Sequence, residues 1–202
     1  KKHGIIVSRE VNDSWIFGNT TWDNKLSGIV IDRASARNVV ANNLVHSNHA
    51  DGITIYESPD NLLWGNHVIG NAKHGIRVRN SMQIRLHENH ASANQLSGIY
   101  GHIKDLRGTD RDLRLDPFEQ NVSMVIVGGE LVHNQSAPFS IDRPLSVELY
   151  DVDLLAPARS GGIRLSGVLG EHQNQLLDLL VRQRVPVIIE PAGGAGRSGS
   201  KG

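Results

Sequence analysis

A glycine followed by an aliphatic residue recurs along this chain at an almost constant interval. The pairs start at Gly4, Gly28, Gly52, Gly75 and Gly98, so the successive intervals are 24, 24, 23 and 23 residues. A fixed period of roughly 20 to 50 residues is typical of solenoids, in which each repeat packs only against its neighbours. We therefore expect a solenoid in which each repeat forms one coil.

The segment after each glycine is short, alternating and rich in β-branched side chains, as in 29–32 (IVID), 53–56 (ITIY) and 76–79 (IRVR). Such segments are predicted to be β-strands. No leucine-rich signature surrounds them, and no apolar run with helical spacing occurs before residue 170. The expected fold class is all-β, a right-handed parallel β-helix with coils of 23–24 residues.

The period is interrupted once, after the fifth glycine. Pro138 follows Asn134 by four residues, just as Gly98 follows Asn94, but Gly98 and Pro138 are 40 residues apart. One coil therefore carries an insertion. The charged stretch 104–120 has no strand alternation, so it is predicted to be a loop that protrudes from the solenoid wall.

The regular coils are expected to occupy residues 1–170. Residues 171–184 (EHQNQLLDLLVRQR) then place leucines on one face of a predicted helix, so 171–191 is expected to be a C-terminal cap over the open end of the solenoid. Residues 185–190 are a candidate strand. The glycine- and serine-rich segment 192–202 is expected to be a flexible tail.

Composition and charge restrict the classes of function. Lysine and arginine together number 21, as do aspartate and glutamate, so the formal net charge is zero and a nucleic-acid partner held mainly by charge is not expected. Without cysteine there are no disulfides and no thiolate chemistry. The sequence contains no transmembrane run and no signal peptide. Because it opens at Lys1 in the middle of a coil, we expect the C-terminal part of a longer protein.

The coil period sorts residues into columns that run along the solenoid axis. Positions one and three after each glycine are aliphatic in nearly every coil and are predicted to point into the core, whereas positions two and four point outward. Neighbouring coils are expected to lie roughly 4.8 Å apart. The outward columns are Ile6, Val30, Thr54, Arg77 and Tyr100; then Ser8, Asp32, Tyr56, Arg79 and His102; and, directly after the strands, Arg9, Arg33, Glu57 and Asn80.

These outward columns carry guanidinium, carboxylate, phenol and imidazole groups in successive coils. Such a wall can meet successive units of a long, charged polymer, and guanidinium groups bind carboxylates through two parallel hydrogen bonds. An acidic polysaccharide fits this pattern. The alternative is that the charges are ordinary surface ion pairs, each of which contributes little to stability. The columns alone do not decide between the two.

Other conspicuous residues are expected to be structural. Two asparagine columns keep the same period and are predicted to bond turn backbone groups and stack on one another. Trp15, Trp22 and Trp64 do not share a column, which favours separate packing roles over one sugar-stacking platform. The histidines form no HxH or HExxH pattern, so neither a metal site nor a cofactor is expected. The asparagine columns are Asn19, Asn43, Asn66 and Asn89, and Asn24, Asn48, Asn71 and Asn94.

Four segments, 1–32, 51–79, 100–106 (YGHIKDL) and 176–184, closely resemble the periplasmic poly(β-D-mannuronate) C5-epimerases of alginate-producing bacteria. The resemblance extends to about residue 191. It implies a right-handed parallel β-helix and a location in the periplasm. It also implies an isomerase activity that converts mannuronate to guluronate within the polymer and needs no metal ion. The implied partners are polymannuronate or alginate and periplasmic alginate secretion proteins, with no nucleic acid and no membrane insertion.

The resemblance also assigns site residues. The family's expected base is the histidine of an Asp-Pro-His-Asp motif one coil before Lys1, and no such motif occurs in these residues; the nearest string, 115–118 (LDPF), has Phe118 in place of the histidine. Arg9, in the string 7–10 (VSRE), matches the arginine that neutralises the substrate carboxylate. Arg9 is the only site residue carried over from the family. The expected substrate-binding residues come instead from the outward columns and the start of the chain: Lys2, His3, Ser8, Asp32, Arg33, Tyr56, Glu57, Arg77, Arg79, Tyr100 and His102.

The chemistry explains why an arginine is needed. Removing the C5 proton of a uronate adds a second negative charge beside the carboxylate, and an arginine held against that group stabilises the charge in the transition state. A base takes the proton from one face and a second donor returns one to the other. Expulsion of the C4 substituent from the same intermediate would instead give a lyase. Without the base, the chain itself is expected to be inactive, which leaves a non-catalytic polysaccharide-binding solenoid or a docking module as alternatives.

Overall fold

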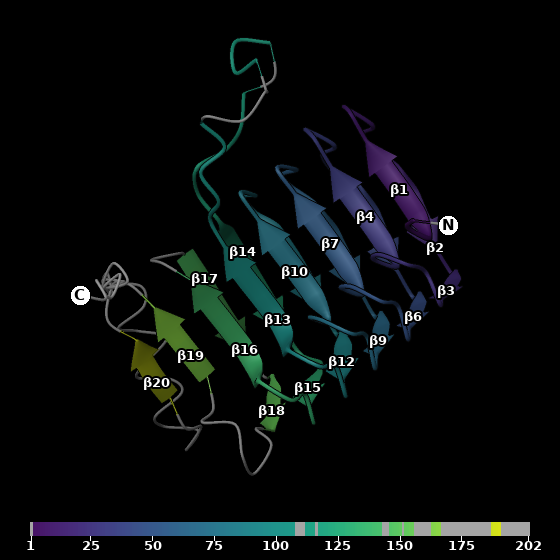
Figure 1. Ribbon diagram of the computed structural model, residues 1–202, viewed down its shortest axis with the longest axis vertical. Coiled ribbons are helices and arrows are strands. Elements are labelled where there is room, and N and C mark those ends of the chain that lie inside the picture. The colour runs from purple at the N-terminus through teal and green to yellow at the C-terminus, as the bar shows by residue number, and fades with distance from the viewer. Residues whose placement is uncertain are drawn as a thin grey trace, which may run out of the picture.

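The computed structural model winds β-strands into a parallel solenoid (Figure 1). Each of the first six coils contributes three strands, and equivalent strands of successive coils pair in parallel. The all-β parallel solenoid expected from the period is therefore confirmed. The structure describes residues 2–107, 112–115, 117–142, 146–150, 152–155, 163–166 and 187–190.

The three sheets form three faces of the solenoid. Face A, with eight strands, comprises β1 (Ile5–Ser8), β4 (Ile29–Asp32), β7 (Ile53–Tyr56), β10 (Ile76–Arg79), β13 (Ser97–His102), β16 (Ala137–Asp142), β19 (Ile163–Ser166) and β20 (Val187–Glu190). Face B comprises β2 (Trp15–Phe17), β5 (Val39–Ala41), β8 (Leu62–Trp64), β11 (Ile84–His87), β14 (Ser123–Val127) and β17 (Ser146–Tyr150). Face C comprises β3 (Thr20–Trp22), β6 (Leu44–His46), β9 (His67–Ile69), β12 (His90–Ser92), β15 (Glu130–Val132) and β18 (Asp153–Leu155).

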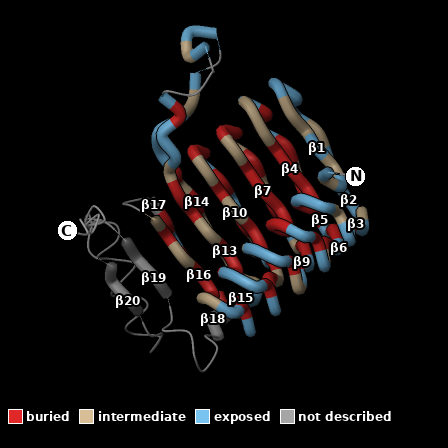
Figure 2. Tube along the Cα trace, viewed as in Figure 1, coloured by how far each residue is buried: buried red, intermediate tan, exposed pale blue. Residues whose placement is uncertain are grey.

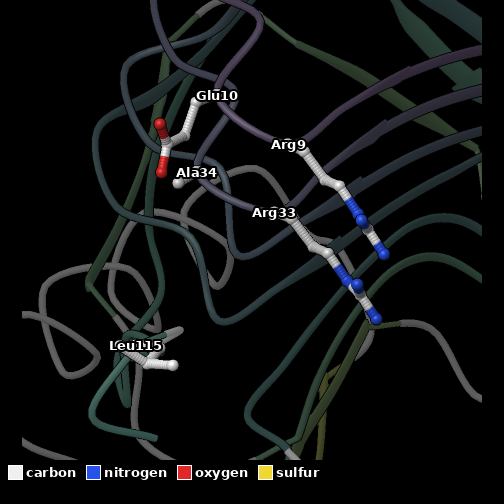
Figure 3. Close-up of a pocket in the computed structure, with 5 residues that line it drawn as sticks. All are labelled: Arg9, Glu10, Arg33, Ala34 and Leu115. Atoms are coloured by element: carbon white, nitrogen blue, oxygen red, sulfur yellow. The ribbon is translucent and has the colours of Figure 1, made fainter. Parts of the chain in front are cut away.

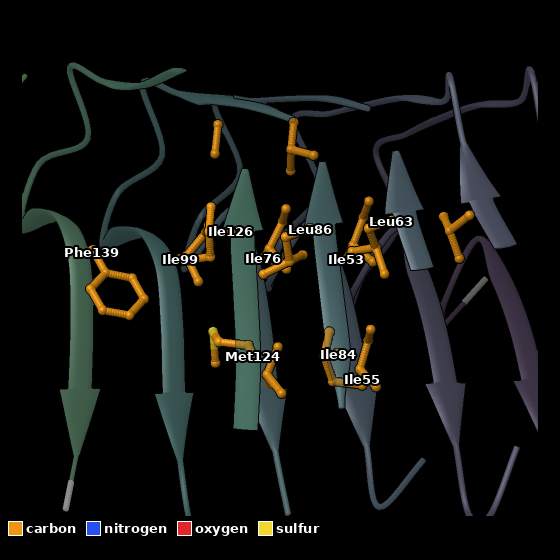
Figure 4. Packing of buried hydrophobic residues seen from close by; sticks show 14 of the residues in the cluster. Ile53, Ile55, Leu63, Ile76, Ile84, Leu86, Ile99, Met124, Ile126 and Phe139 are labelled. Carbon is orange, nitrogen blue, oxygen red and sulfur yellow. The ribbon is translucent and has the colours of Figure 1, made fainter. Parts of the chain in front are cut away.

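The core is a stack of mostly aliphatic side chains that face inward from all three sheets, and Figure 4 shows part of it. Ile29, Ile53 and Ile76 occupy one column of face A and are fully buried, as the period predicts. Leu63 and Leu86 close the core from face B. Burial differs along face A: β4 and β7 are mostly buried, whereas β1 is intermediate or exposed (Figure 2).

Asparagine ladders hold the corners of the coils together. Asn48 donates from Nδ2 to Oδ1 of Asn71 at 3.0 Å, and Asn71 donates in the same way to Asn94 at 3.0 Å. The second column repeats the pattern from Asn43 to Asn66 at 2.9 Å. Most of these side chains are buried, and their remaining bonds go to backbone groups. Their structural role is therefore confirmed.

The glycine column is required by close packing at the coil corner and not by an unusual backbone conformation. A Cβ atom added at Gly52 would lie 2.7 Å from the carbonyl oxygen of Gly75 and 2.8 Å from Nδ2 of Asn71, and it would also strike the side chain of Val68. The positive-φ residues of the described coils lie elsewhere, mostly at the ends of strands.

The long connection between β13 and β14 contains the expected loop 104–120. Residues 104–107, 112–115 and 117–122 of this connection form no strand, and Figure 1 shows the connection rising away from the sheets. Asn80 anchors it, since its Nδ2 donates to the carbonyl oxygen of Lys104 at 2.9 Å and its Oδ1 accepts from the Lys104 amide at 2.8 Å.

Several predictions fall at the C-terminal end. The candidate strand within 185–190 is present as β20 (Val187–Glu190). The predicted helix at 171–184 and the tail at 192–202 lie outside the described residues, so the cap over 171–191 stays a prediction. The expectation that the tryptophans do not share a column is confirmed, since Trp15, Trp22 and Trp64 pair with Val39, His46 and Ala41. Trp22 stacks on the ring of His46. All three nevertheless point outward from faces B and C and are 70%, 60% and 50% exposed, so none of them packs into the core.

Candidate functional site

The outer side of face A brings the predicted polar columns together. Strand pairing aligns Ser8, Asp32, Tyr56, Arg79 and His102 in one row, as the period predicts. The neighbouring row runs from Ile6 through Val30, Thr54, Arg77 and Tyr100. Faces B and C contribute none of these side chains. The candidate site is therefore a continuous strip along one wall of the solenoid.

At the β1–β4 end, two arginines lie side by side on the strip (Figure 3). Arg9 and Arg33 directly follow β1 and β4, and both adopt positive φ angles of 64° and 52°, which turn the chain at the strand end. They line a cavity of about 330 Å³ together with Glu10, Ala34 and Leu115. Leu115 belongs to the β13–β14 connection, so this loop reaches the coil corner that carries Arg9.

The two arginines keep their guanidinium groups largely available. Arg9 is exposed, and the Arg33 side chain is 43% exposed. The only carboxylate within ion-pair distance of either among the described residues is Asp32, whose Oδ2 lies 3.8 Å from Nε of Arg33. Burial, reinforced by Glu57, raises the pKa of the Asp32 carboxyl, and the arginines Arg33 and Arg79 partly offset this. A ligand carboxylate could therefore approach this end without displacing a strong internal partner.

Arg77, in the middle of the strip, is in a different environment. Its Nη1 lies 3.3 Å from Oδ2 of Asp51, a carboxylate that is almost completely buried. Its Nε donates to Nε2 of His102 at 3.0 Å. The guanidinium also lies over the rings of Tyr56 and Tyr100, at 5.6 and 5.8 Å from their centroids.

Arg79 forms a second compensated pair beside it. Nη2 of Arg79 donates to Oε1 of Glu57 at 2.8 Å, and the guanidinium stacks on Tyr56 at 4.1 Å from the ring centroid. Both side chains are largely covered, at 17% exposed for Arg79 and 4% for Glu57. Nε of Arg79 is buried and has no hydrogen-bond partner in the part of the chain that the structure describes.

Aromatic and imidazole rings complete the middle of the strip. Tyr100 stacks between His74 and His102, with ring centroids 4.4 and 4.8 Å away. The pKa of His74 is lowered to about 4 and that of His102 to about 3, mainly by burial; Arg77 contributes to the lowering of both, and Asp51 opposes it at His74. Burial also raises the pKa values of Tyr56 and Tyr100. Both imidazoles are therefore neutral near pH 7 and both phenols keep their protons.

The structure places some predicted site residues differently from a simple outward wall. Val30, Thr54, Glu57, Asn80 and His102 lie in the outward columns but are buried. Glu57 and His102 therefore act mainly as partners of Arg79 and Arg77 and not as freely accessible ligand contacts.

The two predicted site residues at the start of the chain differ in their surroundings. Lys2 is exposed at the first coil. The ring of His3 accepts a hydrogen bond from the Ser27 amide at 3.2 Å through Nδ1, which is a structural bond between coils.

Sequence reasoning missed Asp51 and His74. Both occupy the position directly before a glycine of the repeat, in the column that also holds His3, Ser27 and Ser97. The same column bonds successive coils, since His74 accepts from the Ser97 amide at 3.2 Å and Asp51 accepts from the His74 amide at 3.1 Å. The signal in the sequence was that Asp51 is the one acid in this column, which otherwise holds histidine and serine.

Two further features bear on the class of site. Within the described ranges, no three or more histidine, aspartate or glutamate side chains are grouped so that they could hold a metal ion. Likewise, no helix in the described part of the chain has the length and apolar character needed to span a membrane.

Comparison with known proteins identifies the fold family. A family model described as "Right handed beta helix region" matches residues 1–106, which is just over half of the chain. The chain belongs to the right-handed β-helix family. The handedness expected from the sequence agrees with this membership.

Within this β-helix family, the chain is homologous to mannuronan C5-epimerases. It is 65% identical over 191 residues to the mannuronan C5-epimerase of Pseudomonas putida strain KT2440, which covers 95% of this chain and 37% of the relative. It is 61% identical to the mannuronan C5-epimerase AlgG of Azotobacter vinelandii, with 95% and 36% covered. The crystal structure of the periplasmic alginate epimerase AlgG matches with a TM-score of 0.75 and 62% identity over 78% of this chain and 37% of that one. The chain therefore spans a little over a third of these relatives.

Proposed function

We propose that this chain is the part of a mannuronan C5-epimerase that binds polymannuronate along face A and supplies the arginine that acts on the substrate carboxylate. The observation that carries the proposal is the identity of 61–65% to mannuronan C5-epimerases over 95% of the chain. A match of that extent includes every coil from which the site side chains come. The reaction is an isomerisation of β-D-mannuronate to α-L-guluronate within the polymer.

The shape and chemistry of face A support a polymeric, acidic substrate. A strip that runs through successive coils can contact several sugars of one chain at once. Exposed guanidinium groups at Arg9 and Arg33 can each receive a carboxylate, and bidentate pairing favours arginine for this task. The aromatic side chains Tyr56 and Tyr100 add apolar area against which sugar rings can pack.

In the proposed reaction, Arg9 pairs with the carboxylate of the sugar that reacts. Abstraction of the C5 proton moves charge onto this carboxylate, and a guanidinium already in place stabilises it without reorganisation. The base histidine of the family's Asp-Pro-His-Asp motif is not among the residues of this chain. We therefore assign Arg9 to charge stabilisation and assign the proton transfer to no residue of this chain.

The periplasm and the alginate secretion proteins belong to the same proposal. The location is supported by the solved relative, which is described as a periplasmic alginate epimerase. We expect no nucleic-acid partner, because the formal charges balance to zero.

A two-step experiment tests the proposal. In affinity electrophoresis, the purified 202-residue chain should be retarded by polymannuronate and less by a neutral glucan of the same length. In proton NMR, polymannuronate incubated with the same chain should show no new guluronate signals, because the base is absent. Retardation equal in both gels would contradict the proposed substrate, and new guluronate signals would contradict the assignment of the base to another part of the protein.

A second function, polysaccharide binding without catalysis, is favoured for this chain alone by the missing motif. The comparison that separates it from the epimerase role uses a protein of the relatives' full length. Such a protein should convert mannuronate to guluronate, and release of unsaturated uronates, detected by absorbance, would instead indicate a lyase.

A further inference from the structure

We propose that His102 is a positioning residue that fixes the Arg77 guanidinium for ligand binding on face A. This proposal rests on the proposed function for the identity of the ligand, a polyuronate, but the bond between the two side chains can be tested without it. His102 was expected to contact substrate directly, whereas the structure places it behind Arg77.

The direction of the bond between these side chains follows from their chemistry. Arginine has five N–H donors and no acceptor, so a hydrogen bond between Nε of Arg77 and Nε2 of His102 requires the imidazole nitrogen to accept. An imidazole that accepts at Nε2 is neutral and carries its proton on Nδ1. His102 thereby holds one defined tautomer, and its Nε2 lone pair is not available to a substrate proton.

The groups around His102 keep it in that neutral form. Its ring is buried against Tyr100, and the cationic groups that face it come from several elements: Arg77 and Arg79 of β10, and Lys104 after β13. Its pKa is lowered to about 3, mainly by burial, with smaller contributions from these cations and His74. The acceptor is therefore present throughout the neutral pH range.

The remaining contacts of Arg77 show what the bond accomplishes. Asp51 binds Nη1 in the preceding coil, His102 binds Nε in the following coil, and the guanidinium lies over Tyr56 and Tyr100. Two of its three nitrogens are thus engaged by protein, and Nη2 is the nitrogen that the described network leaves for a ligand. The Arg77 side chain is 24% exposed, so part of it is accessible from outside the solenoid.

This arrangement predicts an effect on affinity that is transmitted through Arg77. Without the acceptor, the long side chain can rotate away from Asp51, and ordering it again opposes ligand binding. Removing the acceptor while keeping the ring should therefore act like removing Arg77, whereas replacing the ring by another acceptor should not.

The test uses His102→Phe, His102→Gln, Arg77→Ala and the double variant His102→Phe/Arg77→Ala of the 202-residue chain, with a mannuronate oligomer as the probe in calorimetry. His102→Phe and Arg77→Ala should each weaken binding about tenfold, as expected for a lost hydrogen bond to a charged group. His102→Gln should stay within about twofold of the wild type. The double variant should be no weaker than Arg77→Ala, because both changes remove the same interaction. The control is His67→Phe, an exposed histidine on face C, which should bind like the wild type.

A second measurement is independent of any ligand. Nitrogen-15 NMR of the wild type should show His102 protonated at Nδ1 and an Arg77 Nε–H that exchanges slowly, and His102→Phe should abolish this protection. Additive losses in the double variant, or Nε2 protonation in the wild type, would overturn the positioning role. Failure of the wild type to bind the oligomer, with the NMR result as expected, would overturn the proposed function and leave the positioning geometry intact.

Discussion

The β1–β4 end and the middle of the polar strip on face A use the same side chain in opposite ways. Arg9 and Arg33 follow the first two strands, are exposed, and have no close carboxylate other than Asp32 at 3.8 Å among the described residues. Arg77 and Arg79 lie on β10, are mostly covered, and pair with the buried carboxylates of Asp51 and Glu57. An exposed guanidinium can give its full charge to an external anion, whereas a covered one already has a counter-charge within the protein and can offer a ligand only the nitrogen that the protein leaves free.

This difference separates two roles within one surface. Removing a partner from a buried pair leaves an uncompensated charge and should destabilise the fold, whereas removing an exposed arginine should leave the fold unchanged and alter ligand chemistry. Loss of stability should therefore mark the covered pairs, and loss of turnover without loss of stability should mark the exposed arginines.

The largest expected effect on stability concerns the covered pair. Glu57→Ala should lower the free energy of unfolding by about 3 kcal/mol, because it leaves the guanidinium of Arg79 largely buried without its carboxylate. Chemical denaturation monitored by circular dichroism would measure this. Glu57→Gln should cost less, since its side-chain oxygen can still accept from Arg79.

The matched control for Glu57 is an exposed pair on the same solenoid. Asp13 accepts two hydrogen bonds from Arg37 at 2.7 and 2.8 Å, but both side chains are more than half exposed. Asp13→Ala should produce no measurable change in stability. Equal losses in Asp13→Ala and Glu57→Ala would remove the distinction between covered and exposed pairs.

The second effect concerns turnover at the exposed end, in a protein of the relatives' full length. Arg9→Ala should leave the melting temperature unchanged and lower kcat by about a hundredfold or more, as expected when a charge-stabilising donor is lost from a transition state. Arg9→Lys should recover little, because an ammonium group cannot make the planar two-point contact. Guluronate formation followed by proton NMR measures both.

Arg33 is the control for Arg9, since it occupies the same column one coil along. Arg33→Ala should raise KM more than it lowers kcat, because Arg33 would meet a neighbouring sugar and not the one that reacts. A larger loss of kcat from Arg33→Ala than from Arg9→Ala would place the reacting sugar in the other coil.

The sequence predicted the rows of the strip but not the partners within them. The period fixes which residues share a column, because parallel pairing repeats the same register in each coil, and Ser8, Asp32, Tyr56, Arg79 and His102 do align. It does not fix the direction in which a long side chain leans.

Arg77 shows why the partners could not be predicted. It reaches back to Asp51 in one coil and forward to His102 in another, and these contacts depend on side-chain torsions that no spacing encodes. Burial could not be predicted from the columns either, since Thr54 lies in an outward column yet is fully buried. The exposed tryptophans add a third limit: columns show which residues are neighbours, not whether anything lies over them.

The third prediction tests the close packing at the glycine corner, which holds successive coils in register. Gly52→Val should destabilise the solenoid by about 2 kcal/mol, because the new side chain would overlap Gly75, Asn71 and Val68 of the next coil. Thermal unfolding measures it. Ala72→Val, at an exposed corner position nearby, should change stability by less than about 0.5 kcal/mol. An unchanged melting temperature in Gly52→Val would show that the coil corner can expand.

The smallest effect concerns Asp32, whose carboxylate lies 3.8 Å from Nε of the exposed Arg33. Its pKa is raised by burial and by Glu57, so the folded state binds this proton more tightly than the unfolded state, whose pKa is near 3.8. Stability should therefore fall as the pH rises from about 3.8 through the folded pKa, and stay level on either side of that window. Asp32→Asn should remove this slope in denaturation curves measured across that range. A slope that persists in the variant would have to come from another carboxyl.

The asparagine ladders fix the spacing between successive coils of the solenoid. Hydrogen bonds of 2.9 to 3.0 Å between asparagine side chains of successive coils prevent the coils from spreading or sliding. Equivalent positions therefore recur roughly every 4.8 Å along the axis. When the repeating unit of a ligand differs in length from that interval, each successive unit is shifted further relative to the coil that it faces. Successive units then meet different parts of successive coils, which is compatible with a strip whose side chains change from coil to coil. The phase of the whole ligand, more than any single contact, would then decide which unit arrives opposite Arg9.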